Sequence, residues 1–226
     1  MSENLKTKKD PSKGHLILAL HSCSEILGIA ILDERAPKES LKSSTFPIGR
    51  SLSNNIFNCL NELLPTSNLK DICRISVAIG PGGFTGTRIT VVLARTLAQQ
   101  LDCDLDGMSS FSLMAPRLLN ELEPIQRKQP FWIIKNLPRR GIIGGKYQVK
   151  RDSDNKKIKE VLELQKPHLL PSEAKVEPSL YASNDVEKDL LRMLSISLTK
   201  YKMKQNSNWH KVLPIYPTSP VESKIT

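Results

Sequence analysis

The stretch IGPGGFTGTR, residues 79–88, joins a short apolar run to an amphipathic one. Glycines free the backbone for a tight turn, and the first turn of a following helix carries N–H groups without intrahelical acceptors. Such a turn suits an anion, and it equally suits a sharp bend that holds no ligand. The candidate anion-binding residues are Gly80, Gly82, Gly83, Thr85, Gly86 and Arg88.

The two well-known phosphate-binding loops do not match this stretch. The P-loop pattern GxxxxGK[ST] needs a lysine, whereas this loop has none and places five residues between Gly80 and Gly86. The dinucleotide pattern GxGxxG is one residue shorter than the spacing found here, although the aspartates within 102–106 lie where a ribose-binding acid is expected. The loop therefore lacks the pattern of a site that works on phosphate unaided.

Hydrophobic periodicity on both sides of the loop predicts a mixed α/β lobe. The predicted strands are 15–22, 26–33, 39–48, 75–80 and 104–108, and the predicted helices are 51–64, 86–101 and 110–122. Three strands followed by alternating helices and strands imply a mixed sheet with helices on its faces.

A second, shorter unit follows the proline-flanked segment 123–130. Its predicted strands are 131–135, 141–151 and 157–164, followed by one helix at 186–204. This order repeats the opening of the first unit and then stops. We expect a disordered tail at 1–14, a first lobe at 15–122 and a smaller second lobe at 123–226.

The helix predicted after the glycine loop carries two apolar stripes on opposite sides. One consists of Ile89, Val92, Leu93 and Thr96, and the other of Val91, Ala94, Ala98 and Leu101. We expect the first stripe to cover the sheet. The second is rich in small residues, which favours close approach by another helix, either of a partner or of the second lobe.

Positive charge is concentrated in the second half of the chain. The net charge is +10, of which residues 117–226 carry +9. Residues 127–159 hold 11 basic side chains against two acidic ones. Such a patch attracts RNA or an acidic partner, or is a solvated hairpin surface. The candidate tRNA-contacting residues are Arg139, Arg140, Lys146, Lys150 and Arg151.

Cysteine and histidine usage gives no pattern of a catalytic or metal site. The 4 cysteines form no CxxC pair, and the 4 histidines form no HxxxH or HExxH pattern. His21, at the end of the first predicted strand, is more simply a hydrogen-bonded core residue than a general base. The apolar run at 15–22 is too short to span a membrane, so we expect a cytoplasmic protein without membrane contact.

Four segments together resemble the bacterial TsaB family, also called YeaZ. They are ILALHSCSE (17–25), GPGGFTGTRITVVLARTLA (80–98), NLPRRGIIGGKYQV (136–149) and LPIYPTSPV (213–221). The usual family forms are ILAIDTATE, GPGSFTGLRIG and a DARRGEVY-like strand entry. The resemblance runs in order from about residue 15 to residue 220, and the central match is the most specific.

This resemblance implies the actin/sugar-kinase/Hsp70 (ASKHA) fold, an α/β fold with two ribonuclease-H-like lobes. It also implies a subunit without its own catalytic residues that partners a TsaD-like enzyme in tRNA threonylcarbamoyladenosine biosynthesis. A TsaE-like ATPase and tRNA are the further partners, the tRNA via the complex, and a homodimer is an alternative assembly. ATP and metal are expected on the partner subunits, with no cofactor in this chain alone.

The family's partner interface lies on the two helices of the first lobe. Carried onto this sequence, the interface residues are Leu52, Ile56, Val91, Ala94, Arg95 and Ala98. They include the small-residue stripe for which the sequence indicates a partner outside the lobe.

Three departures from the family pattern remove groups that phosphate or metal chemistry uses. His21 replaces the aspartate that ends the first strand, Gly83 replaces a serine, and Asn136 precedes LPRRG in place of the DARRG acid. An imidazole does not hold Mg²⁺ as a carboxylate does. We therefore expect a subunit without catalysis of its own. The alternative functions are those of a stand-alone ASKHA-type ATPase or phosphotransferase and of a tRNA-binding module.

Overall fold

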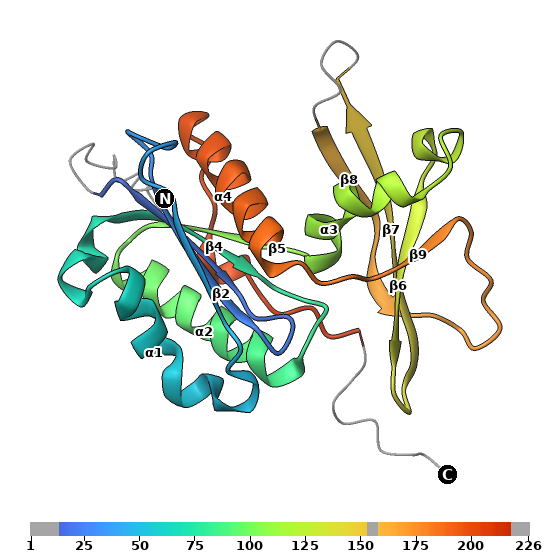
Figure 1. Ribbon diagram of the computed structural model, residues 1–226, viewed down its shortest axis with the longest axis horizontal. Coiled ribbons are helices and arrows are strands. Elements are labelled where there is room, and N and C mark those ends of the chain that lie inside the picture. The colour runs from blue at the N-terminus through green and yellow to red at the C-terminus, as the bar shows by residue number, and fades with distance from the viewer. Residues whose placement is uncertain (1–13, 153–157, 218–226) are drawn as a thin grey trace, which may run out of the picture.

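The computed structural model describes residues 14–152 and 158–217 and contains two β-sheets with helices packed on them (Figure 1). The first sheet has the strand order β3-β2-β1-β4-β5. Its strands are β1 (Leu16–His21), β2 (Leu27–Asp33), β3 (Lys42–Phe46), β4 (Ile72–Ala78) and β5 (Asp104–Met108). β1 pairs antiparallel with β2 and parallel with β4, so the sheet is mixed, as the sequence predicts.

Helices cover both faces of the first sheet. α1 (Leu52–Leu63) and α2 (Phe84–Gln100) pack on one face, and α4 (Val186–Lys202) packs on the other (Figure 1). A strand that is buried on both sides has no solvent-facing positions to make polar. This explains why β1 and β2 read as continuous apolar runs instead of alternating ones.

The second sheet repeats the order of the first and lacks its fifth strand. Its order is β8-β7-β6-β9, formed by β6 (Phe131–Leu137), β7 (Gly141–Arg151), β8 (Ile158–Leu169) and β9 (Ser179–Tyr181). α3 (Ser110–Leu118) packs on one of its faces, around Phe111, Phe131 and Tyr147. The expected α/β class with two sheets, the second of them shorter, is confirmed. β9 was not predicted, because three residues are too few to show a period.

α4 does not belong to the second sheet, although it lies within the range 123–226 assigned to the second lobe. Its apolar side packs on the first sheet, where Gly28 of β2 leaves room that a Cβ would fill against Val186 and Leu190. The chain after α4 also stays with the first sheet, since Ile215 N–H donates to the Ile79 carbonyl at 2.8 Å. Packing there buries Val186, Leu190, Met193 and Leu194 against the apolar face of the first sheet. Residues 1–13 of the predicted tail lie outside the described residues.

A buried ion pair joins the far edge of the first sheet to α4. Arg74 of β4 is 1% exposed, and its Nε lies 2.6 Å from an Asp106 oxygen on β5. Lys200 of α4 and Ser207 also donate to Asp106, at 3.0 and 2.6 Å. Asp106 is therefore occupied in holding α4 and the following chain, and it is not placed as a ribose-binding acid.

The ionised form of Asp106 is strongly favoured in the folded protein. Burial opposes ionisation, but hydrogen bonds from Arg74 and Ser207 and the charges of Arg74 and Lys200 outweigh it, which lowers the pKa of Asp106 to about 2. The stabilisation that Asp106 contributes is complete above its unfolded pKa near 4. It is lost as the pH falls from about 4 through about 2.

We expect Asp106→Asn to lower the free energy of unfolding by about 3 kcal/mol, because it leaves the buried Arg74 charge without its partner. Asp33→Asn is the matched control, since its partner Arg35 is 61% exposed. This surface pair contributes less than about 1 kcal/mol. Urea unfolding at pH 7 measures both values, and an equal loss in the two variants would contradict a special role for Asp106.

Candidate functional site between the two lobes

The glycine loop at residues 79–88 packs against the turn after β1. A Cβ on Gly82 would overlap the backbone of Cys23, and one on Gly86 would lie 2.8 Å from the Ser22 carbonyl oxygen. Gly83 N–H donates to the Cys23 carbonyl at 3.0 Å, and Ser110 N–H donates to the Gly80 carbonyl at 2.7 Å. Close backbone contact thus explains Gly82 and Gly86, and it places the loop from which α2 begins.

A cavity of about 240 Å³ lies between the glycine loop and the β6–β7 hairpin of the second sheet. The first lobe contributes the start of α2, the hairpin contributes Lys135 and Arg140, and the chain at 215–217 closes a third side. Its described lining residues are Pro81, Gly82, Phe84, Thr87, Lys135, Leu137, Pro138, Arg140, Ile143, Ile215, Tyr216 and Pro217.

Of the predicted anion-binding residues, only Gly82 lines this cavity. Gly80 and Gly86 are committed to contacts with neighbouring backbone, and Thr85 and Arg88 lie elsewhere on the first two turns of α2. Sequence reasoning did not single out Phe84, Lys135 or Tyr216. Lys135 and Tyr216 lie far from the loop in sequence, so no local pattern could place them beside it.

Thr87 is the polar group of the cavity wall that lacks a hydrogen-bond partner. The residue is 4% exposed, and its hydroxyl finds no partner of acceptable geometry among the described residues. The Cys23 thiol is its polar neighbour. Burial raises the pKa of that thiol to about 11, against smaller opposing effects of Thr87, Gly80 and the Lys135 charge. Cys23 is therefore a neutral, unreactive thiol at neutral pH.

Two aromatic residues of the cavity wall, Phe84 and Tyr216, contact the Arg88 side chain. The Arg88 guanidinium lies 4.5 Å from the centre of the Phe84 ring and 5.8 Å from that of Tyr216. Arg88 Nε also donates to the Tyr216 hydroxyl at 3.2 Å. The contacts fix Tyr216, and with it the third wall of the cavity, against the start of α2.

His21 lies in a separate buried cluster at the junction of β1, α3 and α4. Its Nε2 is 3.7 Å from an Asp189 oxygen, and Arg117 of α3 reaches the same carboxylate at 3.5 Å. Arg117 also donates to the Ser183 carbonyl in the chain that enters α4. Neither ring nitrogen of His21 has a hydrogen-bond partner among the described residues, so the expectation of a hydrogen-bonded core histidine is wrong.

Burial shifts both partners of the His21–Asp189 contact toward their neutral forms. Desolvation, aided by the Arg117 charge, lowers the pKa of His21 to about 4. Desolvation also raises the pKa of Asp189 to about 6, although the charges of Arg117 and Arg192 act against it and that of Asp185 acts with it. At neutral pH the imidazole is uncharged, which does not suit it to replace a metal-binding carboxylate.

The small-residue stripe of α2 faces the sheet of its own lobe. Val91, Ala94 and Ala98 are each 0% exposed within the first core cluster. Leu52 and Ile56 of α1 are 5% and 2% exposed, so of the predicted interface residues only Arg95 reaches the surface. The prediction is wrong for these five residues, because small side chains also let a helix settle closely on a sheet.

The other stripe is divided: Leu93 is buried in the same core and Ile89 packs against it, whereas Val92 and Thr96 face outward. Val92 of α2 is 55% exposed, and Phe57 of the neighbouring α1 is 64% exposed. Arg95 is held at the edge of this face by the Trp209 ring, whose centre lies 5.7 Å from its guanidinium. The two helices thus present an outer surface with apolar side chains, although through other residues than those predicted.

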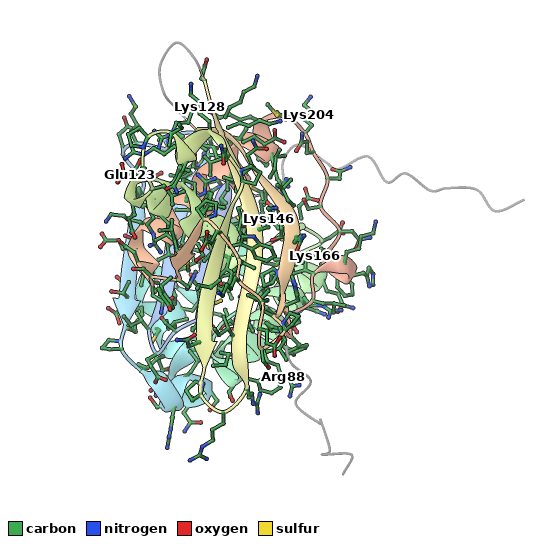
Figure 2. All side chains as sticks on the ribbon, turned by 90° about the vertical axis from the view of Figure 1, so that its right-hand side faces the viewer. Arg88, Glu123, Lys128, Lys146, Lys166 and Lys204 are labelled. Carbon is green, nitrogen blue, oxygen red and sulfur yellow. The ribbon has the colours of Figure 1, made fainter. Side chains whose placement is uncertain are left out.

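The predicted tRNA patch is divided between the two ends of β7. Arg139 and Arg140 lie in the β6–β7 turn, whereas Lys150 and Arg151 lie at the last residues of the 11-residue strand, roughly 30 Å away at the rise of an extended chain. Lys146 lies between them on the face of the sheet shown in Figure 2, 5.9 Å from the centre of the Trp132 ring. The five residues do not form one compact patch.

Comparison with known proteins identifies the chain's relatives. A family model described as TsaD, tRNA N6-adenosine threonylcarbamoyltransferase, matches residues 48–134. The tRNA threonylcarbamoyladenosine biosynthesis protein TsaB of Bacillus subtilis (strain 168) is 35% identical over 107 residues, 44% of this chain and 43% of the relative. Over these segments the chain is similar to TsaB and to the TsaD family model. The match spans less than half the length of that curated relative.

Solved structures of YeaZ-like proteins share the fold of this chain. A protein from Pseudomonas aeruginosa with similarity to peptidase YEAZ has a TM-score of 0.65 at 18% identity, covering 90% of this chain and 99% of that chain. YeaZ from Pseudomonas aeruginosa has a TM-score of 0.63 at 19% identity, covering 89% and 99%. At such identities the likeness shows the fold. No helix within the described ranges is long and apolar enough to cross a membrane.

The opposite pKa shifts of His21 and Asp189 predict opposite pH dependence once either partner is removed. With Asp189→Asn only the lowered histidine pKa remains, so unfolding free energy should rise as the pH increases from about 4 to 6.5. With His21→Asn only the raised carboxyl pKa remains, and stability should fall as the pH increases from about 4 to 6. Urea midpoints relative to the parent test this, and slopes of the same sign would contradict it.

Proposed function

We propose that this chain acts in tRNA threonylcarbamoyladenosine biosynthesis as a non-catalytic subunit that binds and stabilises a TsaD-like enzyme. The curated relative is named for that pathway, and the matching family model is that of TsaD itself. The observation that carries the docking part is the outward apolar surface of α1 and α2, which neither lobe covers. The partner would bind there in the way that one helix pair packs on another.

The chemistry of this surface suits a specific protein contact. Phe57 and Val92 are large apolar side chains exposed on adjacent helices, and Asn54, Asn61 and Glu62 of α1 form a polar border. Apolar anchors surrounded by polar residues are typical of the centre and rim of an interface. Arg95, held by Trp209, adds a positioned cation at the other edge. A second copy of this chain would be the alternative occupant of the same surface.

The proposed subunit has no catalysis of its own, and the burial and lowered pKa of His21 support this part of the proposal. The ASKHA enzymes that the family resembles use an aspartate at this strand end. Here the position holds an imidazole that is 1% exposed and has a pKa lowered to about 4, so it offers no negative charge to a metal. ATP and metal would then be bound by the partner subunits, a TsaE-like ATPase among them.

A direct contact with tRNA would involve one end of the second sheet and not the whole basic stretch. Arg139 and Arg140 at the β6–β7 turn are exposed and lie close to the cavity, whereas Lys150 is already paired with Glu160 at 3.5 Å. We therefore assign any tRNA contact to the turn. This part of the proposal depends on the complex, because two arginines alone neutralise few phosphates.

The outer surface of α1 and α2 gives a direct test. We expect Phe57→Glu and Val92→Glu each to weaken binding to the co-expressed TsaD-like enzyme by at least about tenfold, because each places an unpaired charge in an apolar contact. Isothermal titration calorimetry measures the dissociation constants, and unchanged unfolding midpoints would show that both variants fold.

Ile125→Glu is the control for added charge at an exposed apolar residue, since Ile125 is 78% exposed in the second lobe. It should leave binding unchanged. Ala94→Glu is unsuitable because Ala94 is fully buried, so the variant would test folding. Full binding by the Phe57 and Val92 variants would reject this docking surface, and an equal loss with Ile125→Glu would reject its specificity.

A further inference from the structure

We propose that the cavity between the two lobes binds a small organic oxyanion, a carboxylate or phosphate group carried on a compact apolar body. This site is a property of the isolated chain and goes beyond the proposed docking function, which uses the outer surface of α1 and α2. The proposal rests on the charge of the cavity, on a buried hydroxyl in its wall that has only a weak thiol neighbour, and on its shape.

The charged groups of the cavity are all positive. Lys135 and Arg140 line it, and none of the described lining residues is acidic. Lys135 of the hairpin lines the same cavity as Gly82 and Thr87 of the first lobe. The first turn of α2 begins at Phe84 in the same wall, and its N–H groups add partial positive charge. An anion entering from solvent would therefore meet complementary charge from both lobes.

Thr87 supplies the second indication of a ligand. It lines the cavity, is 4% exposed, and its hydroxyl has no hydrogen-bond partner among the described residues other than a weak contact with the Cys23 thiol. A buried hydroxyl without a strong partner costs free energy that a bound acceptor recovers. Thr87 Oγ1 can donate to an oxyanion, whereas Lys135 can neutralise its charge. The two groups come from different lobes, so the ligand would bridge them.

The remaining wall is apolar and limits the size of the ligand. Leu137 and Ile143 come from the hairpin, and Phe84, Ile215 and Tyr216 complete the lining on the side of the first lobe. A volume of about 240 Å³ lies below the range of roughly 300–1,000 Å³ that is typical of pockets for drug-sized ligands. The site thus fits one charged group on an aromatic or branched aliphatic body better than a nucleoside triphosphate.

The test uses the full chain with two anionic probes, phenyl phosphate and benzoate, and one neutral probe of similar shape, benzyl alcohol. Saturation-transfer NMR and calorimetry measure binding of each. We expect at least one anion to bind and benzyl alcohol to bind at least tenfold more weakly. The preferred anion identifies the charged group as phosphate or carboxylate.

Lys135→Met should weaken binding of the preferred anion about tenfold, because it removes a charge-assisted hydrogen bond and retains the length of the side chain. Lys166→Met is the matched control. Lys166 is an exposed residue of β8 in the same lobe and is not among the lining residues (Figure 2). Its loss changes the net charge equally and should leave binding unchanged.

Thr87→Val separates a binding role from a structural one. Valine has nearly the same shape and removes the hydroxyl, so the variant without ligand should be as stable as the parent or more stable. Its affinity for the preferred anion should nevertheless fall severalfold. Lower stability of this variant without ligand would show that the hydroxyl serves the fold.

Three results would overturn the proposal. They are binding of neither anion, equal binding of benzyl alcohol, and equal weakening by Lys135→Met and Lys166→Met. None of these depends on a partner protein. Failure of this site would leave the docking proposal intact, and loss of partner binding in the Phe57 and Val92 variants would leave this site intact.

Discussion

The close contact between the glycine loop and the turn after β1 is the constraint on which the arrangement of the first lobe depends. Gly82 and Gly86 touch the backbone of Ser22 and Cys23 at distances that a side chain would prevent. This contact determines where α2 begins, and Ala94 and Ala98 then let the helix lie close on the sheet. Val92 is turned outward as a consequence, and the start of α2 becomes one wall of the interlobe cavity.

The second lobe is joined to the first by returning chain as well as by the linker. The chain leaves the second sheet after β9, and α4 then buries its apolar side on the first sheet. There Asp189 of α4 lies close to His21 and Arg117. The following residues are held by the network around Asp106 and then pass Ile79 to reach the cavity at Tyr216. A single chain thus ties the junction, the sheet edge and the cavity wall together, which makes their geometry interdependent.

Local periodicity and spacing predicted β1 to β8, the mixed first sheet and the shorter second sheet, because these features are visible in short stretches of sequence. They failed where a helix had two plausible faces. Val91 and Ala94 read as a partner stripe, yet they pack on the sheet, since small residues permit close approach to any surface. The clustering of basic residues in the sequence also failed to predict a compact patch. Arg140 precedes β7 and Lys150 lies near its end, so the length of the strand separates them. Tyr216 and Lys135 meet the loop only through tertiary structure.

His21 stands at the strand end where the usual TsaB/YeaZ pattern has an aspartate. Its imidazole is 1% exposed and uncharged at neutral pH, so this residue supplies no negative charge there. Lys135 and Arg140 give the cavity positive charge, which would attract the proposed oxyanion. The proposed partner surface around Phe57 and Val92 uses none of the residues that line the cavity, so docking and anion binding would be independent of each other.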